Sequence, residues 1–371
     1  MPGTFVRPRR WSVRLVRVAG IDVRVHTTLA ILLAWIAIDP LVAGRGPRAA
    51  AAALVLVVFV FAIIAVHELA HALVARRYGV ATRDITLLPI GGVSSLERIP
   101  ERPRQELAIA LAGPSVNLAL AALLAGGLAL ARVPLVPGGG VGAGGALAVE
   151  LLWINVALAG FNLLPAFPMD GGRVVRALLA LRLDYDRATR AAARLGQVVA
   201  VGFGVIGLFY NPLLVLIAVF VWIGARAEAA AVHVRAALSG VPIERVMITR
   251  FLMLSPGDTL ERALHVALGG FQRSFPVVDG GHVVGVLTRD AVVEGLRSVG
   301  ADVPVAQVMR RDFDVVGRRD PVERVLPRLA SGAAPPVVVT DDGAVVGMVT
   351  PDSVAELLAA GGASRPEERA R

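Results

Sequence analysis

The sequence predicts a membrane-embedded all-α core of about six transmembrane helices, followed by a cytoplasmic α/β domain. Three observations support this fold class. Of the 371 residues, 56% are hydrophobic and only 18% are charged, which is too apolar for a single soluble globule. Long apolar stretches extend as far as Ala225, and arginines recur in alternate gaps between them. Beyond Ala225 the pattern changes to short β-branched runs that alternate with helical periods.

The sequence contains six apolar stretches, and a helix needs roughly 20 residues to cross a bilayer. Most are long enough, and the last two are borderline. They comprise residues 27–43, 49–75, 106–131, 146–164, 195–210 and 212–225. We therefore expect a membrane domain over residues 27–238, preceded by a cytoplasmic amino-terminal segment of residues 1–26.

The formal net charge of +9 comes from arginine alone, and the positions of the arginines indicate membrane topology. The even-numbered gaps carry Arg76, Arg77, Arg83, Arg98, Arg102, Arg104, Arg173, Arg176, Arg182, Arg187, Arg190 and Arg194. The odd-numbered gaps carry far fewer. By the positive-inside rule the even-numbered gaps face the cytoplasm, and six crossings then place both termini there. No basic stripe with interleaved aromatics is present, which argues against nucleic-acid binding.

The second apolar stretch contains the sequence His67-Glu68-Leu69-Ala70-His71. Residues four apart share a helix face, so both imidazoles can reach one metal ion and Glu68 can reach a water on that ion. Polar side chains in such a segment would each cost about 2–3 kcal/mol in lipid without a partner, so we favour a functional site over a chance match. The chain has no cysteine, so the metal ligands must be histidine or carboxylate.

A catalytic zinc needs a third protein ligand and one open position. The best candidate is Asp170, because two prolines and two glycines in residues 162–172 break the fourth apolar stretch near the same side of the membrane. The alternative is an ordinary turn aspartate before Gly-Gly. Asn162 could bond a neighbouring helix or stabilise the transition state, and both interpretations stay open. For residues 113–117, which end in Asn117, we favour close helix packing.

The last third of the chain contains a repeat with a spacing of 62 residues. Val246-Met247 recurs as Val308-Met309, and the Gly285 to Thr288 run recurs as Gly347 to Thr350. A period this long, present twice, indicates a pseudo-symmetric pair of small α/β modules and not a solenoid. We place the modules at residues 242–300 and 301–360, and we expect residues 361–371 to be a disordered tail.

Together these motifs resemble the site-2 protease family of intramembrane zinc metalloproteases, in the subgroup with a carboxy-terminal pair of cystathionine-β-synthase (CBS) modules. The resemblance rests on residues 67–71, 91–93, 113–117 and 162–172. It implies that Zn2+ is bound by His67, His71 and Asp170. It also implies that Glu68 is the general base and that Asn162 helps to hold the substrate or oxyanion. Residues 87–95 would form a small β segment on which an unwound substrate pairs as an added strand, the alternative being a plain cytoplasmic loop.

The implied function is zinc-dependent hydrolysis of a peptide bond within or near the transmembrane helix of a membrane-bound regulatory protein, in the lipid bilayer of the cell membrane. The substrate helix must unwind locally, because a helix shields its carbonyls by internal hydrogen bonds. The alternative is a CBS-gated metal transporter or channel that uses the same His/Asp cluster as an ion site. Such a site has no need of Glu68 beside its first ligand, so the carboxylate favours the protease.

CBS pairs often bind adenine nucleotides in the cleft between their modules. The modules that do so typically carry an aspartate three residues after the threonine, whereas Ala291 and Ser353 occupy those positions here, after Thr288 and Thr350. Adenine-nucleotide binding therefore stays open beside a second interpretation, a platform for homodimerisation or substrate docking.

Overall fold

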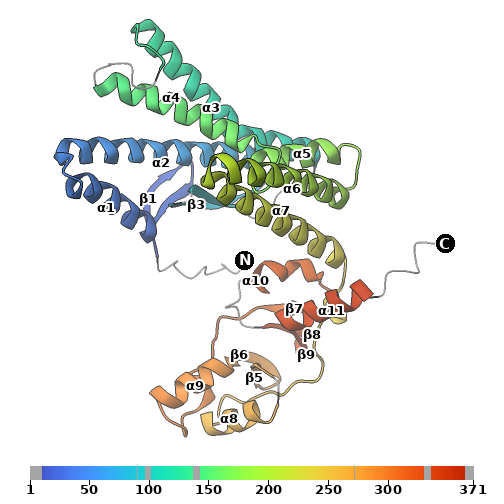
Figure 1. Cartoon of the computed structure of the whole chain (residues 1–371). Helices are drawn as coiled ribbons and strands as arrows, with labels where there is room; N and C mark the ends of the chain where they lie inside the picture. The colour runs from blue at the N-terminus through green and yellow to red at the C-terminus, as the bar shows by residue number, and fades with distance from the viewer. Residues whose placement is uncertain are drawn as a thin grey trace. The chain divides into compact units, whose positions relative to one another are not determined.

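The computed structural model describes residues 11–89, 91–96, 102–136, 143–270, 272–329 and 336–363. The chain divides into two compact units, Met1–Ala230 and Ala231–Arg371 (Figure 1). The first unit carries the long helices and the second carries the repeat. Helix α7 (Pro212–Leu238) contains the boundary between them.

Five helices in the described part of the chain are long and apolar enough to cross a membrane. They are α2 (Gly46–Arg77), α3 (Pro103–Leu130), α4 (Ala143–Asn162), α6 (Tyr185–Tyr210) and α7. The first predicted span forms the shorter helix α1 (Thr27–Val42), which has 16 residues. The two stretches of borderline length belong to helices of 26 and 27 residues, because each helix continues into flanking charged turns. The predicted α-helical membrane core is confirmed.

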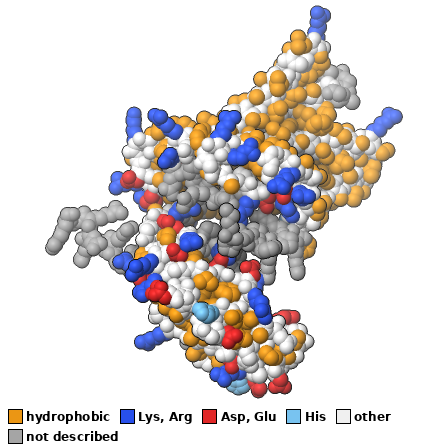
Figure 2. Space-filling model, turned by 180° about the vertical axis from the view of Figure 1, so that it is seen from behind, with side chains coloured by type: hydrophobic (Ala, Val, Ile, Leu, Met, Phe, Trp, Pro, Cys, Tyr) orange, Lys and Arg blue, Asp and Glu red, His pale blue; other side chains and the backbone are white. Residues whose placement is uncertain are grey.

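The outer surface of this unit is apolar. Figure 2 shows hydrophobic side chains gathered over the long helices. Leu123 on α3 is 73% exposed, and Val198 and Phe209 on α6 are 69% and 79% exposed. Patches of this kind are rare on soluble monomers, whereas helices with satisfied backbone groups and apolar outer faces suit a lipid environment. The chain is therefore a membrane protein.

A four-stranded sheet packs against α2. Its strands are β1 (Ser12–Val18), β2 (Ile21–His26), β3 (Thr82–Leu88) and β4 (Gly91–Leu96), in that spatial order. Strands β2 and β3 are parallel, and the other neighbours are antiparallel. Ile21 and Ile85 pack on Ala72 of α2. The β segment expected at residues 87–95 is thus present, apart from residue 90, which lies outside the described residues.

The hairpin of β1 and β2 was not expected, because residues 1–26 were interpreted only as an amino-terminal segment. Apolar and charged residues alternate in β2, and Ile21 and Val23 are its buried positions. This period of two is the sequence signal of a half-buried strand. Within the described residues, the hairpin leaves β4 at the opposite edge of the sheet, paired only with β3.

An irregular segment, residues 163–169, connects α4 to the short helix α5 (Asp170–Ala180). The start of α5 packs tightly on this segment. A Cβ on Gly171 would stand 2.2 Å from the Leu164 carbonyl oxygen, and one on Gly172 would stand 2.7 Å from the Ala166 carbonyl carbon. Only glycine allows this approach of the two backbones. The expected break in the fourth apolar stretch therefore fixes where Asp170 lies.

The second unit contains two similar modules. The first consists of η1 (Ile243–Arg245), α8 (Leu260–Leu268), β5 (Ser274–Asp279), β6 (His282–Thr288) and α9 (Arg289–Ser298). The second consists of η2 (Val305–Gln307), β7 (Val315–Gly317), η3 (Val322–Arg324), α10 (Leu326–Leu329), β8 (Val337–Asp341), β9 (Ala344–Val349) and α11 (Pro351–Ala363). Helix α11 extends three residues into the predicted tail, and residues 364–371 lie outside the described residues.

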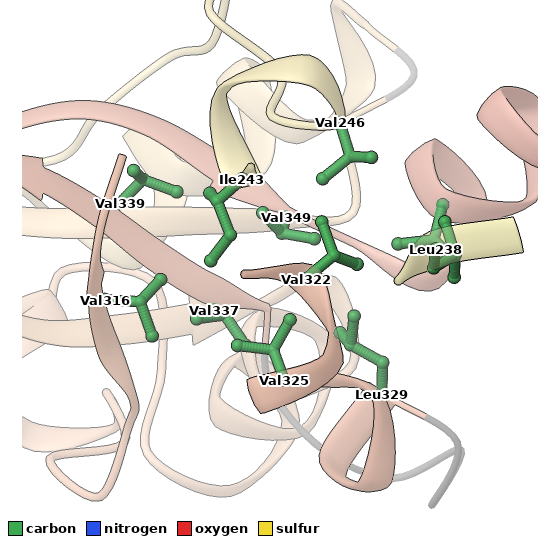
Figure 3. Close-up of a cluster of buried hydrophobic side chains, with 11 residues drawn as sticks. Leu238, Ile243, Val246, Val316, Val322, Val325, Leu329, Val337, Val339 and Val349 are labelled. Atoms are coloured by element: carbon green, nitrogen blue, oxygen red, sulfur yellow. The ribbon is translucent and has the colours of Figure 1, made fainter. Parts of the chain in front are cut away.

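The two modules exchange their opening segments symmetrically. Ile248 bridges to Met348 in β9, and Arg310, 62 residues after Ile248, bridges to Val286 in β6. The buried core around β8 and β9 includes Ile243 and Leu238, which precede the first module's own strands (Figure 3). This reciprocal packing explains the repeat in the sequence.

Candidate metal centre

The three predicted metal ligands lie together in the structure. His67 and His71 project from one face of α2, and Asp170 is the first residue of α5. The Nε2 atoms of the two histidines are 3.1 Å apart. The Asp170 Oδ2 atom lies 3.1 Å from His71 Nε2 and 3.3 Å from His67 Nε2. All three residues are buried.

Hydrogen bonds on the far side of each imidazole orient these nitrogens. His71 Nδ1 donates to the carbonyl oxygen of Ile109, at 2.7 Å. His67 Nδ1 donates to Oδ1 of Asn117, whose Nδ2 donates in turn to Oδ1 of Asn155, at 3.1 Å. Asn155 Nδ2 donates to the carbonyl of Leu151 within α4. With each Nδ1 protonated, a neutral imidazole turns the lone pair of its Nε2 toward Asp170.

This donor set fits a zinc ion. In that tautomer, two Nε2 lone pairs and a carboxylate oxygen face one another, an arrangement that is repulsive unless a cation lies among them. Two histidines and one carboxylate are also the ligands of many catalytic zinc sites, with a fourth position left for water or substrate. Gly113 of α3 packs against the metal-facing edges of the rings, where a Cβ would stand 2.3 Å from His71 Nε2 and 2.5 Å from His67 Nε2. The residues present therefore suit zinc.

Glu68 follows His67 on α2 and is half-buried. Its side chain lies against Gly92 of β4, where a Cβ would stand 2.7 Å from Glu68 Cγ. The carboxylate is thus placed beside the metal cluster and beside the edge strand of the sheet. That position suits a base acting on a water at the metal while a peptide occupies the edge.

Asn162 is the last residue of α4, and its Nδ2 donates to the carbonyl of Leu158 in the same helix, at 2.9 Å. The structure therefore does not bring this amide into the hydrogen-bonded cluster. It brings in Asn117 instead, for which sequence reasoning favoured helix packing, and Asn155, which that reasoning did not consider. The signal was available for both, because an amide in an apolar run needs a partner.

Comparison with known proteins shows the family and the domains of the chain. Residues 55–137 and 143–203 match Peptidase family M50, and residues 243–298 and 305–360 match the CBS domain. A zinc metalloprotease of Methanocaldococcus jannaschii is 33% identical over 278 residues, which cover 75% of this chain and 78% of that relative. Rip3 of Mycobacterium tuberculosis, whose name assigns it to the zinc metalloproteases, is 32% identical over 96% of this chain and 95% of its own.

A solved structure of the site-2 protease from Methanocaldococcus jannaschii is 35% identical, covers 59% of this chain and 95% of its own, and has a TM-score of 0.43. The matches to relatives cover both the helical unit and the paired modules. The chain therefore belongs to peptidase family M50, the site-2 protease family of intramembrane zinc metalloproteases, and carries a pair of CBS domains.

Proposed function

We propose that His67, His71 and Asp170 hold the zinc of this intramembrane endopeptidase and that Glu68 is its general base. The convergence of two Nε2 atoms and one carboxylate oxygen, within 3.3 Å of one another, carries the proposal. A metal transporter would not need Glu68 at the edge of such a cluster, and the family matches give that alternative no support.

Zinc, when bound, supplies an acidified water and polarises the scissile carbonyl. Glu68 takes a proton from the attacking water and returns it to the leaving amine as the peptide C–N bond breaks. Asn117 and Ile109 accept from the two Nδ1 atoms and so keep the Nε2 atoms of both imidazoles aimed at the site. Asn162 can hold the substrate or oxyanion with its second Nδ2 hydrogen, because its bond to the Leu158 carbonyl uses only one of the two.

The free edge of β4 supports binding of the substrate as an added strand. In the part of the chain that the structure describes, strand β4 has β3 as its one neighbour in the sheet, and its Gly92 lies against Glu68. A locally unwound segment of a transmembrane substrate can form backbone hydrogen bonds along this edge. The hydrocarbon of the membrane offers no hydrogen-bond partners for those groups. The scissile bond would then lie beside the base.

Two variants test the proposed roles. Glu68→Gln should retain zinc and lose cleavage of a model transmembrane substrate, since it keeps the side-chain shape and removes the proton acceptor. Asp170→Asn should lose zinc. Glu150→Gln, on an exposed position of α4, is the matched control and should change neither property. If Glu68→Gln cleaves at the wild-type rate, the assignment of the base is wrong; if Asp170→Asn keeps its zinc, the ligand assignment is wrong.

We further propose that the CBS pair binds an adenine nucleotide. A cavity of about 1700 Å³ lies between the two modules, and Arg250, Arg273 and Arg310 are among its lining residues. Such a volume accommodates a nucleotide, and arginine suits its phosphates. Full-length protein should bind a fluorescent ATP analogue, and Arg250→Gln should weaken binding while Arg297→Gln, outside the cavity, should not. If the protein does not bind the analogue but forms dimers that dissociate into monomers on dilution, the competing role as a homodimerisation platform is favoured.

The arginine distribution supports a multi-pass topology in the cell membrane, with both termini and the CBS pair in the cytoplasm. Because the chain has no cysteine, a single introduced cysteine is its sole thiol. Its labelling therefore shows on which side of the membrane that position lies. Val136→Cys, between α3 and α4, should react with a membrane-impermeant maleimide in intact cells. Ser298→Cys, in the first CBS domain, should react only after lysis, and the reverse labelling would invert the topology.

A further inference from the structure

A fully buried guanidinium follows Asp170 closely in the sequence, and it has no role in the proposed hydrolysis. Arg176 is on α5, six residues after Asp170, and its side chain has 0% exposure. A buried charge in a membrane protein is costly unless it is paired, so such residues usually have a specific task.

Four different parts of the first unit hold this guanidinium. Its Nε donates to Glu106 Oε1 of α3 at 2.7 Å, and Nη2 lies 2.5 Å from the same oxygen. Its Nη1 donates to Glu228 of α7 at 2.5 Å. The rings of Phe167, before α5, and Tyr185, on α6, each have their centroid 5.0 Å from Cζ. A planar fork with donors on its edge and apolar faces can make all of these contacts, whereas a lysine ammonium cannot.

Glu106, the α3 residue of this network, lies on the same face of α3 as the residues that orient the histidines. Glu106, Ile109, Gly113 and Asn117 follow one another at spacings of three and four residues, so they share one face of α3. Ile109 accepts from His71, Gly113 packs against both rings, and Asn117 accepts from His67. Glu106 extends the same face by one more turn and binds Arg176. Helix α3 is thus connected to the elements that supply all three ligands.

We propose that Arg176 is a positioning residue, which sets Asp170 at the correct distance from His67 and His71 by fastening α5 to α3. The inference rests on the proposed assignment of these three residues as zinc ligands. His67 and His71 are fixed to each other by α2, whereas Asp170 stands at the junction of α5 with the irregular segment 163–169. A metal site tolerates a misplacement of only about 0.5 Å, so the third ligand needs a separate support.

The test uses full-length protein in detergent. Arg176→Lys keeps the charge and removes the fork, and Arg182→Lys, exposed just beyond α5, is the matched control. Zinc affinity is measured by competition with a chromophoric chelator, well below the melting temperature of each variant. The visible spectrum of the Co2+-loaded protein reports ligand geometry. Arg176→Lys should bind zinc about 10- to 100-fold more weakly, the range seen when outer-shell partners of a metal are removed, with an altered Co2+ spectrum. Arg182→Lys should match the wild type.

Glu106→Gln is the second variant, and it is decisive if Arg176→Lys does not fold. It retains an acceptor oxygen for Arg176 and removes the charge, so a zinc affinity between those of wild type and Arg176→Lys is expected. A lower melting temperature with unchanged zinc affinity and Co2+ spectrum would show a purely structural role and overturn the inference. Asp170→Asn distinguishes a failure of the ligand assignment from a failure of the positioning role of Arg176. If it keeps zinc, the ligand assignment itself fails; if it loses zinc while Arg176→Lys keeps it, only the positioning role fails.

Discussion

Gly113 lies on α3 directly against the two histidines, and its replacement by alanine would add a single carbon there. That carbon would stand 2.3 Å from His71 Nε2 and 2.5 Å from His67 Nε2, about 1 Å inside ordinary van der Waals contact. Zinc–nitrogen bonds are about 2.0–2.1 Å long, so the methyl group would compete with the ion for the same space. Neither ring can retreat freely, because Ile109 and Asn117 hold their Nδ1 atoms.

We expect Gly113→Ala to bind zinc at least about 100-fold more weakly, which corresponds to about 2.8 kcal/mol at 1.4 kcal/mol per factor of ten. Chelator competition measures the affinity. Gly126→Ala is the matched control, since it lies on the same helix and its Cβ would meet nothing within 4 Å. It should keep zinc and gain about 0.5–1 kcal/mol of stability, the ordinary effect of alanine in a helix interior. A Gly113→Ala protein that binds zinc within threefold of wild type would refute the reasoning.

Three further outcomes are expected. Asn117→Ala removes the acceptor of His67 Nδ1 and should weaken zinc binding about 10- to 100-fold by chelator competition, whereas Ser115→Ala, on an exposed position of the same helix, should not. Gly92→Ala places a carbon 2.7 Å from Glu68 Cγ, so kcat should fall. The zinc content, measured by atomic emission, should stay at one ion per chain. A parallel loss of zinc would contradict this prediction. Ile243→Ala empties a fully buried position in the CBS core and should cost about 2–5 kcal/mol, seen by calorimetry as a lower melting temperature of the CBS transition with zinc affinity unchanged.

Local patterns in the sequence predicted that His67 and His71 lie together, and the family resemblance added much of the weight for Asp170 as the third proposed ligand. The i, i+4 spacing of His67 and His71 fixes them on one helix face whatever the rest of the fold does. Asp170 was predictable because prolines and glycines interrupt an apolar stretch there, and a break at membrane depth needs a reason. The 62-residue spacing likewise predicted paired modules, and the reciprocal bridges of Ile248 and Arg310 explain it.

Long-range partners could not be predicted in this way. Arg176 entered the sequence analysis only as one of many arginines that set topology, because nothing local connects it to Glu106, 70 residues earlier, or to Glu228. The orientation of His67 depends on Asn117, 50 residues away, and on the packing of α3 against α2. Such contacts are decided by how helices pack, which a single sequence leaves open.

The hydrogen bond between Asn117 and Asn155 also bears on how the protein enters the membrane. These amides lie on α3 and α4, which are consecutive in the chain, and both are buried. Either helix alone in hydrocarbon would carry an amide without its interhelical partner, at a cost of about 1–2 kcal/mol. We therefore expect α3 and α4 to move into lipid as a paired hairpin during synthesis. The support for His67 would then be assembled before Asp170 has been made.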